Sequence, residues 1–415
     1  MKVISFLGTG PYKRVKYKFS DGFLKEEDFF PLVLLHYLLE KGEGALDVLL
    51  LVSEEVLRHK NWFHFQGRIK TMPAVSLHPI VYEWRREEKL WEVFLALDEK
   101  IGEGQKVVVD ITHSFRFIPF IMVMMINYLE KVKGGKIAGV YYGNFEARDE
   151  KTGEVPVFEI GQFMRLLDWT FSVEFFLKTG NAKVATELLR KENAELHKRG
   201  NRPRHLSGFS SLINSLSSDL INLNWKGARR IRERILNFPA EALEDEVRER
   251  LPFAVPLIRR LHYFGTSLEI GEESWERLTL EELKKQLSLI RWYFNFGYLR
   301  NAVVLTREFI VNCWIYVNGI EEGWLREDIR RTEEGKLVEI VRRFAKAEPI
   351  LRNINSILDV RNAIAHALMK ENEMPNLGNV KSFVESLALE EFLSKLEDMK
   401  NKYKGVLNEE DEPGG

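Results

Sequence analysis

The chain has 415 residues, 45% of them hydrophobic, which is enough to build the cores of two or three domains. Its 61 Lys and Arg balance 62 Asp and Glu, so the net charge of −1 excludes a basic field over the whole protein, and any nucleic-acid site must be local. The single cysteine, Cys313, excludes an intrachain disulfide, and no Cys or His cluster has the spacing of a zinc site.

Targeting and membrane signals are absent from the sequence. No apolar run approaches the roughly 20 residues of a membrane-spanning helix, and the N-terminal run VISFL is too short for a signal peptide. We therefore expect a cytoplasmic protein with neither a membrane segment nor a cofactor. A high content of charged residues beside only four Gln favours a thermophilic source.

Residues 1–160 alternate short β-rich runs with helical stretches. Apolar runs such as VLLLV and KVVVDI are typical of strands buried on both faces, as in a parallel sheet covered by helices. The pattern predicts a Rossmann-like α/β domain whose last strands are either parallel or antiparallel. The predicted strands are Lys2–Leu7, Leu46–Val52, Val75–Tyr82, Lys106–Thr112, Ile137–Gly143 and Val155–Ile160. The predicted helices are Glu26–Leu39, Arg86–Ile101 and Phe117–Lys133.

Two of these strands end in loops that are equipped to bind a nucleotide. The loop GTGPYKR, residues 8–14, combines glycines for close backbone approach with an aromatic ring and two cations. The loop DITHSFR, residues 110–116, precedes a helix that Thr112 or Ser114 would cap, leaving backbone amides to face an anion. The candidate ligand residues at this edge are Gly8, Thr9, Gly10, Tyr12, Lys13, Ser53, Thr112, His113, Ser114, Arg116 and Asn144. The alternative for the second loop is a capped turn with incidental polar residues.

Strand signals stop after Ile160, and the remainder is predicted to be helical. We expect a helical linker at residues 161–205, an all-α domain at 206–405 and a disordered acidic tail at 406–415. Basic clusters at Arg190–Arg204 and Lys226–Arg234 are either guides for RNA phosphates or solvated helix faces. The helices predicted in the all-α domain are 206–225, 227–237, 240–264, 279–297, 299–318, 335–346, 351–370 and 379–404.

The segment LDVRNAIAHALMK, Leu358–Lys370, carries an Arg and a His five positions apart. On a helix, Arg361, Asn362 and His366 fall within ~140° of one another, opposite an apolar face. An imidazole can move the proton of an RNA 2'-hydroxyl, and a guanidinium can bind phosphate. One chain supplies one such pair, and a two-fold partner would bring two pairs together. The alternative is an ordinary helix with a solvated Arg and a locally packed His.

The segments ISFLGTGPYK, DITHSFRFIPF and RNAIAH together resemble the CRISPR-associated CARF–HEPN ribonucleases that accompany type III systems. The resemblance implies an N-terminal CARF domain that dimerises and binds cyclic oligoadenylate, as a tetra- or hexa-adenylate. It also implies a C-terminal HEPN domain that cleaves single-stranded RNA without metal. Arg361 and His366 match the R-x4-6-H motif of that family, with Asn362 at its second position, and Gly8–Lys13 and Thr112–Arg116 match the ligand loops.

The resemblance therefore predicts a homodimeric endoribonuclease of antiviral defence that does not bind DNA stably. A further hypothesis is that the CARF domain slowly cleaves its own ligand, with Thr112, His113 and Arg116 steering the attack. Two other hypotheses are a nucleotide-sensing transcriptional regulator without nuclease activity and a metabolic nucleotide-dependent enzyme. Against the regulator, the sequence shows no evident helix-turn-helix with a basic recognition helix. Against the metabolic enzyme, it lacks the glycine and acidic fingerprints of dinucleotide binding.

Overall fold

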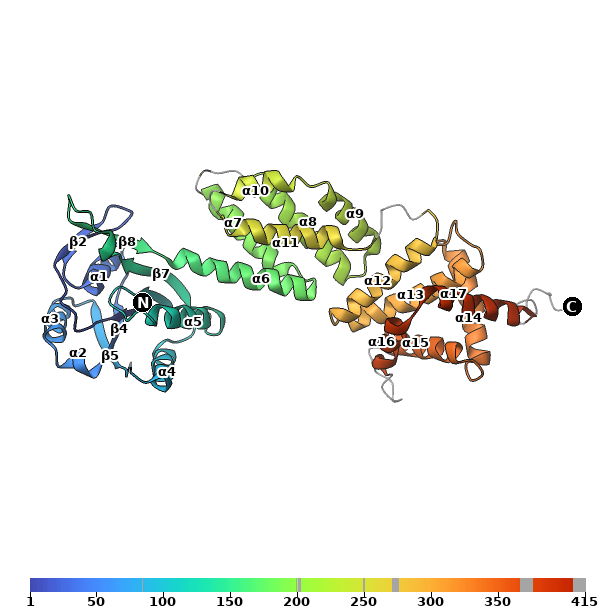
Figure 1. Cartoon of the computed structure of the whole chain (residues 1–415), viewed down its shortest axis with the longest axis horizontal. Helices are drawn as coiled ribbons and strands as arrows, with labels where there is room; N and C mark the ends of the chain where they lie inside the picture. The colour runs from blue at the N-terminus through green and yellow to red at the C-terminus, as the bar shows by residue number, and fades with distance from the viewer. Residues whose placement is uncertain are drawn as a thin grey trace. The chain divides into compact units, whose positions relative to one another are not determined.

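The computed structural model describes residues 1–405 apart from 84, 199, 201–202, 249–250, 271–275 and 366–375, and it does not describe the side chains of residues 87 and 365. The chain divides into two compact units, Met1–Asp168 and Trp169–Gly415 (Figure 1). No helix within the described residues is long and apolar enough to cross a membrane.

The first unit is built on an eight-stranded sheet with the order β3-β2-β8-β7-β6-β1-β4-β5. Its strands are β1 (Lys2–Phe6), β2 (Val15–Lys18), β3 (Leu24–Glu27), β4 (Leu46–Val52), β5 (Val75–Val81), β6 (Lys106–Asp110), β7 (Lys136–Gly143) and β8 (Glu154–Glu159). Five neighbouring strands, from β7 to β5 in that order, are parallel, whereas β8 runs antiparallel to β7. After β1 the chain forms β2 and β3 at the far edge of the sheet. Among the parallel strands, β4 and β5 then lie on one side of β1 and the later β6 and β7 on the other, which makes the β1/β6 boundary the switch point of the sheet.

Helices cover both faces of this sheet, so the unit has three layers (Figure 1). Its helices are α1 (Phe30–Glu40), α2 (Glu54–Leu57), α3 (Lys60–Ile69), α4 (Leu90–Lys100) and α5 (Ile118–Lys131), with 3-10 turns at Glu87–Lys89, Phe145–Ala147 and Gly161–Met164. Alternate strand residues point to opposite faces. Val48 and Leu50 pack in one core cluster with residues of α1 and α3, whereas Leu49 and Leu51 pack in another with residues of α4 and α5.

All six predicted strands are present, and the α/β class of this unit is confirmed. Four elements were missed: β2, β3, α2 and α3. The predicted helix Glu26–Leu39 was wrong at its start, because Glu26 and Glu27 belong to β3 and the helix begins at Phe30. Strand β3 (LKEE) has little β propensity of its own, and pairing with β2 across a turn that contains Gly22, at φ +92°, holds it in place.

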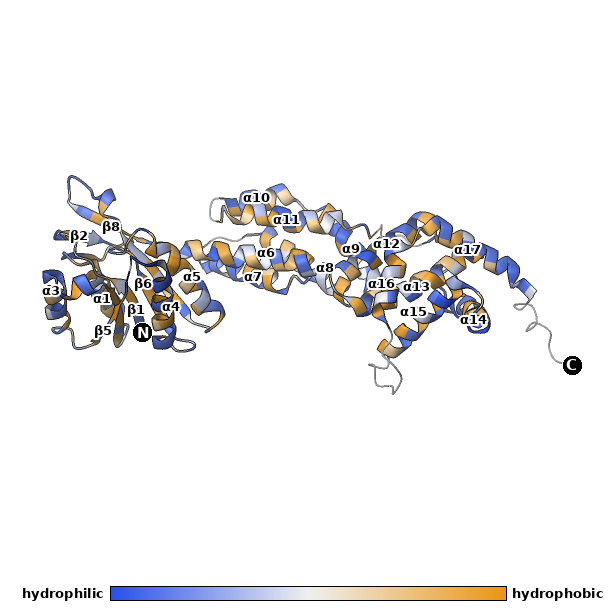
Figure 2. Cartoon of the chain, turned by 60° about the horizontal axis from the view of Figure 1, so that its bottom comes forward, coloured by the Kyte–Doolittle hydropathy of each residue, from blue (hydrophilic) through white to orange (hydrophobic). Residues whose placement is uncertain are grey.

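The second unit is helical, and one hydrophobic core cluster runs from Trp169 to Tyr403. Figure 2 shows its helices with orange and blue residues side by side, as expected of helices with one buried face. The helices are α6 (Arg165–Thr179), α7 (Lys183–Lys198), α8 (His205–Ile221), α9 (Trp225–Leu236), α10 (Ala240–Arg248), α11 (Ala254–Ser267), α12 (Leu280–Asn295), α13 (Leu299–Val317), α14 (Glu327–Phe344), α15 (Pro349–Ala365), α16 (Leu377–Ser386) and α17 (Leu389–Lys402).

Several boundaries in this unit differ from the prediction. The segment expected as a linker contributes Phe176 and Leu189, both fully buried, to the common core. The single helix predicted at 240–264 is two helices, with Pro252 in the interruption, where its ring and missing N–H oppose a continuous helix. The helix predicted at 379–404 is also two, separated by extended backbone at Leu387 and Ala388. Helix α14 begins at Glu327, well before the predicted 335. The predicted tail, 406–415, lies outside the described residues.

Candidate ligand pocket and catalytic helix

A cavity of about 310 Å³ lies at the carboxyl end of the parallel strands, beside the switch point. Parallel strands end at the same edge of their sheet, so the loops after β1, β6 and β7 meet there although they are far apart in the sequence. The cavity is lined by Gly10, Pro11, Tyr12, Lys13, Tyr17, Asp28, Thr112, His113, Tyr142, Gly143, Phe145 and Glu146.

The loop after β1 is fixed by hydrogen bonds at Gly8 and Gly10. The Gly8 N–H donates to the Tyr12 hydroxyl at 2.7 Å, and the Asn61 amide donates to the carbonyl oxygens of Gly8 and Gly10, both at 3.0 Å. A Cβ at Gly8 would stand 3.0 Å from the Tyr12 hydroxyl, so a side chain at this position would press against it. Asn61 lies on α3, which the sequence pattern missed, and no motif identified it.

The loop after β6 is held by a buried carboxylate. Ser5 donates to Asp110 Oδ2 at 2.6 Å, and the Thr112 backbone N–H donates to Asp110 Oδ1 at 2.8 Å. The Thr112 hydroxyl accepts from the Gly143 N–H at 2.9 Å, which ties this loop to the end of β7. Burial raises the pKa of Asp110 to about 6, so the carboxyl is mostly ionised at neutral pH.

The His113 side chain already contacts two other residues of the first unit. Its Nε2 accepts from the Phe30 backbone N–H at 3.2 Å, and its ring lies 4.2 Å from the Tyr12 ring, centroid to centroid. Burial lowers the pKa of His113 to about 4, so the imidazole is neutral at pH 7. With Nε2 accepting, the proton must sit on Nδ1, and the ring can offer a ligand a hydrogen-bond donor but no positive charge.

The structure brings five of the eleven candidate ligand residues to the wall of the cavity: Gly10, Tyr12, Lys13, Thr112 and His113. Gly8 supports that wall from behind through Tyr12. Thr9, Ser114, Arg116 and Asn144 lie in the same loops but are not lining residues, and the side chains of Thr9 and Arg116 are exposed.

One predicted detail of this edge was wrong. Neither Thr112 nor Ser114 caps α5, because the residue before the helix is Phe117, and the Ser114 hydroxyl instead donates to the Ile111 carbonyl at 2.8 Å. Ser53 lines a second cavity, of about 510 Å³, at the ends of β4 and β5. That cavity is lined by Ser53, Glu54, Glu55, Arg58, Val81, Tyr82, Glu83, Arg85, Arg86, Lys89 and Glu92.

Sequence reasoning also missed the acidic side of the main cavity. Lys13 is the only Lys or Arg among the described lining residues, and it shares the lining with the carboxylates of Asp28 and Glu146. A hydrogen bond with Glu27 keeps the pKa of Asp28 low, so that carboxylate stays charged. The remaining lining surface is largely aromatic, and the Tyr142 hydroxyl donates to Glu146 Oε2 at 3.0 Å. Aromatic rings suit stacking on a base, and carboxylates can accept from the exocyclic amine of adenine.

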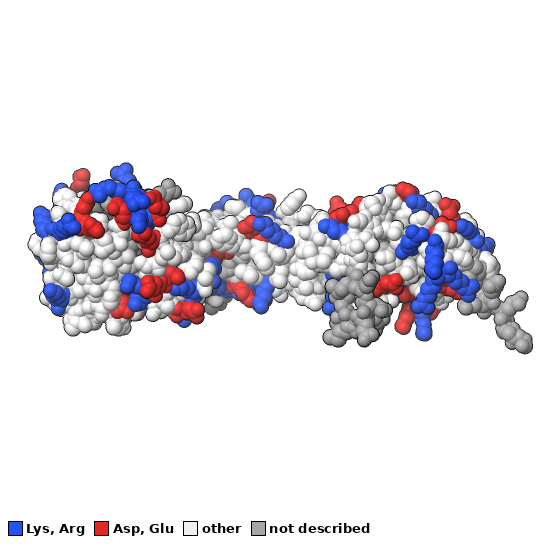
Figure 3. Space-filling view, turned by 90° about the horizontal axis from the view of Figure 1, so that it is seen from below, with Lys and Arg blue, Asp and Glu red and all other residues white. Residues whose placement is uncertain are grey.

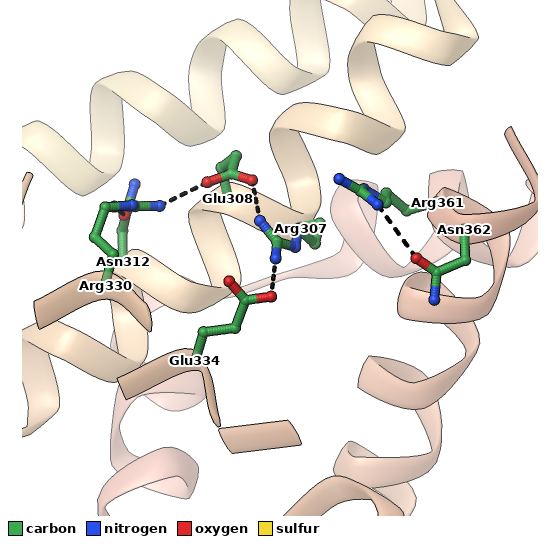
Figure 4. A network of polar contacts seen from close by, with 7 residues as sticks. All are labelled: Arg307, Glu308, Asn312, Arg330, Glu334, Arg361 and Asn362. Atoms are coloured by element: carbon green, nitrogen blue, oxygen red, sulfur yellow. Dashed lines mark hydrogen bonds and ion pairs between the residues drawn. The ribbon is translucent and has the colours of Figure 1, made fainter. Parts of the chain in front are cut away.

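The second site of interest is the end of α15. Val360 is 1% exposed and packs in the core, while Asn362 is exposed on the other side, as the amphipathic pattern predicts. Arg361 Nη1 donates to Asn362 Oδ1 at 3.3 Å, which steadies the guanidinium (Figure 4). His366, the third member of the predicted constellation, lies outside the described residues.

A chain of polar contacts crosses the second unit, and Figure 4 shows its end beside Arg361 and Asn362. It begins at Arg229 on α9, which is fully buried and donates to both oxygens of Glu282 on α12, at 2.7 and 2.9 Å. It continues through two amides, since Gln286 donates to Glu282 at 2.9 Å and Asn312 on α13 donates to Gln286 at 2.8 Å.

The far end of this chain joins α13 to α14. Arg330 donates to Asn312 and to Glu308, both at 2.6 Å. Arg307 completes it by pairing with Glu308 and with Glu334. These contacts fix α13 and α14 in register, and α15 packs against both of these helices. The network therefore helps to position α15, the helix that carries Arg361.

Replacing Glu282 with Ala is expected to lower the free energy of unfolding by about 3 kcal/mol, because the substitution leaves the guanidinium of Arg229 buried without its main counter-charge. Thermal or denaturant unfolding measures the loss. The neighbouring Glu281→Ala is the matched control, since Glu281 is exposed in the same helical turn. Equal stability of the two variants would contradict a structural role for this pair.

The amino-acid sequence of this chain is similar to those of known CRISPR-associated proteins. Residues 2–146 match the family model described as CRISPR system endoribonuclease Csx1, CARF domain. The CRISPR-associated protein MJ1674 of Methanocaldococcus jannaschii is 25% identical over 212 residues. That alignment spans 50% of this chain and 29% of the length of its relative. The matched region contains the loops after β1, β6 and β7 that form the cavity. Residues 2–146, within the first unit, therefore form a CARF domain of the kind that CRISPR-associated proteins carry.

Proposed function

We propose that the chain is an endoribonuclease of type III CRISPR defence that cyclic oligoadenylate activates. The first unit is the sensor and the second, with Arg361 and His366, cleaves single-stranded RNA. The observation that carries the proposal is the cavity of the matched domain, where Tyr12 and Lys13 from one loop meet Thr112 and His113 from another. Aromatic rings with a single cation suit an adenine next to a phosphate.

The cleavage step follows from the chemistry of the two side chains. An imidazole at position 366 removes the proton of an RNA 2'-hydroxyl, and the oxygen attacks the adjacent phosphorus in line. The bond from phosphorus to the 5'-oxygen breaks, and that oxygen leaves with a proton. The products are a 2',3'-cyclic phosphate and a 5'-hydroxyl end. The Arg361 guanidinium offsets the negative charge that builds on the phosphate oxygens.

The decisive test is incubation of the purified protein with labelled single-stranded RNA in EDTA, with and without cyclic tetra- or hexa-adenylate. The proposal requires cleavage that EDTA does not abolish and that one of the two rings accelerates. A protein that binds a ring but leaves RNA intact would instead be a sensor without nuclease activity.

A homodimer is part of the proposal, because the α4 and α5 side of the first unit exposes large apolar side chains. On α5, Phe120 is 70% and Met124 52% exposed, and on α4 Trp91 is 69% and Leu95 62% exposed. Much of the face of the first unit seen in Figure 3 is free of charged side chains. Large exposed apolar side chains on two helices that contact each other, as α4 and α5 do through Phe94 and Tyr128, are typical of a protein interface, and the same surface on a second copy is a suitable occupant.

The variant Phe120→Glu/Met124→Lys is expected to be monomeric in light scattering and to lose activation by oligoadenylate, since charges would be buried in the interface. Phe63→Glu is the matched control, because Phe63 is 59% exposed on α3 of the same unit. A double variant that remains a dimer would place the interface elsewhere.

We also propose that the sensor slowly cleaves its own ligand, whose 2'-hydroxyls can attack neighbouring phosphates once they are held in line. Because Nε2 of His113 already accepts from Phe30, the expected role of His113 is to orient the ligand, while Thr112 lines the same cavity and Arg116 lies in the same loop. The test is chromatography of cyclic tetra- and hexa-adenylate after many hours with the His366→Ala protein. Rings that stay intact would rule this activity out.

A further inference from the structure

The basic cluster of α9 is divided between two faces of the helix. Arg229 points inward to Glu282 and lies over the Trp225 ring, 4.6 Å from its centroid, and Arg232 donates to the Thr266 carbonyl at 3.1 Å. These two arginines hold α9 in the unit. Arg230 and Arg234, in contrast, are exposed, and neither forms a hydrogen bond or ion pair with the described part of the chain.

The two exposed arginines line a groove of about 410 Å³ between α8 and α9. They lie four residues apart, which places them on one helix face with a rise of about 6 Å between them. The groove is lined by Gly208, Leu212, Arg230, Glu233, Arg234, Asn237, Phe238 and Pro239. Two guanidinium groups against the one carboxylate of Glu233 leave a positive balance.

Phe238 gives the groove an aromatic wall. Its ring lies 5.5 Å from the Phe209 ring and 6.3 Å from the His205 ring, centroid to centroid, so it is held on its inner side while lining the groove. Gly208 adjoins that wall, since a Cβ there would be in ordinary contact with the Phe238 ring at 3.8 Å. An aromatic face next to two unpaired cations is the combination that binds a base and its flanking phosphates in single-stranded nucleic acid.

We propose that the α8/α9 groove is a second RNA-binding site, at which the substrate strand is held apart from the Arg361 helix. The proposal rests on the proposed ribonuclease function, but binding is separable from cleavage. Arg230 and Arg234 contact successive phosphates, and a base lies on Phe238. An acidic peptide would satisfy the two arginines equally well but would make little use of the aromatic wall, and for this reason RNA is the better occupant.

The test is binding of a fluorescein-labelled 2'-O-methyl single-stranded RNA, measured by anisotropy at several salt concentrations. This probe lacks the attacking 2'-hydroxyl, so its binding is measured whether or not the protein is a ribonuclease. Arg230→Ala/Arg234→Ala should weaken binding at least about ten-fold and reduce the slope of log K against log salt by about 1.4, or 0.7 for each lost phosphate contact. Phe238→Leu should weaken binding roughly ten-fold with the slope unchanged.

Arg260→Ala is the matched control, because Arg260 is an exposed cation on α11 of the same unit without a partner in the described residues. Thermal unfolding verifies that each variant is folded. Unchanged affinity and slope in the double arginine variant would overturn the proposal, as would an equal loss in the control. Polyglutamate that competes as well as RNA, with no effect of Phe238→Leu on RNA binding, would show an acidic-peptide site instead.

Discussion

Replacing Arg361 or His366 with Ala is expected to lower the rate of RNA cleavage by about 10²- to 10⁴-fold, the usual effect of losing a positioned acid–base group or the cation that stabilises the transition state. Oligoadenylate binding should be unchanged, since the ligand cavity is built from residues of the first unit. Single-turnover cleavage of labelled RNA in EDTA, at saturating activator, measures the effect.

The controls for this experiment lie on the same helix. Arg352→Ala removes an exposed arginine from α15 and should retain nearly full activity. Asn362→Ala should lower the rate less than Arg361→Ala does, because within the described residues the one side-chain hydrogen bond of Asn362 is accepted from the Arg361 guanidinium. Full activity in either Arg361→Ala or His366→Ala would remove this pair from the mechanism. A parallel loss in Arg352→Ala would point to unfolding of α15.

The second large effect is expected at the sensor. Lys13→Ala should raise the oligoadenylate concentration for half-maximal activation roughly 10- to 150-fold, the worth of a hydrogen bond to a charged group. The loss is large because Lys13 is the only cation among the lining residues that the structure describes, and the carboxylates of Asp28 and Glu146 remain. The maximal rate should be unchanged, since saturating ligand restores the active state.

Lys13 and Arg116 lie in loops at the same edge of the sheet, but their substitutions are expected to differ in effect. Arg116→Ala is expected to shift the activator dose less than Lys13→Ala, because Arg116 is exposed and does not line the cavity. Lys16→Ala is the matched control, since Lys16 is an exposed lysine on the neighbouring strand β2. Activator titrations of RNA cleavage give both the dose and the maximal rate. A Lys13→Ala protein with an unshifted dose and a reduced maximal rate would exclude the proposed contact.

The sequence by itself determined the parallel core of the first unit and the edge where its ligand loops meet. Runs such as VLLLV and KVVVDI must be buried on both faces, and parallel strands bring the loops after β1 and β6 to one edge whatever the length of chain between them. The 3.6-residue period likewise placed Val360 in the core and Asn362 outside it. These results follow from local periodicity and topology alone.

Only the tertiary structure decided which side chains lie on the same surface, and which of them are buried, charged or hydrogen-bonded. Asp28 and Glu146 reach the cavity of Lys13 from distant segments, and the Phe30 N–H that occupies His113 Nε2 belongs to a helix 83 residues away in sequence. On α9, Arg229 is buried and Arg230 is exposed, and the buried guanidinium depends on its hydrogen bond to Glu282. Glu282 lies 53 residues later in the sequence, so no local pattern predicts this pair. Hydrogen bonding, burial and charge pairing act between residues that the fold brings together, so spacing along the chain does not encode them.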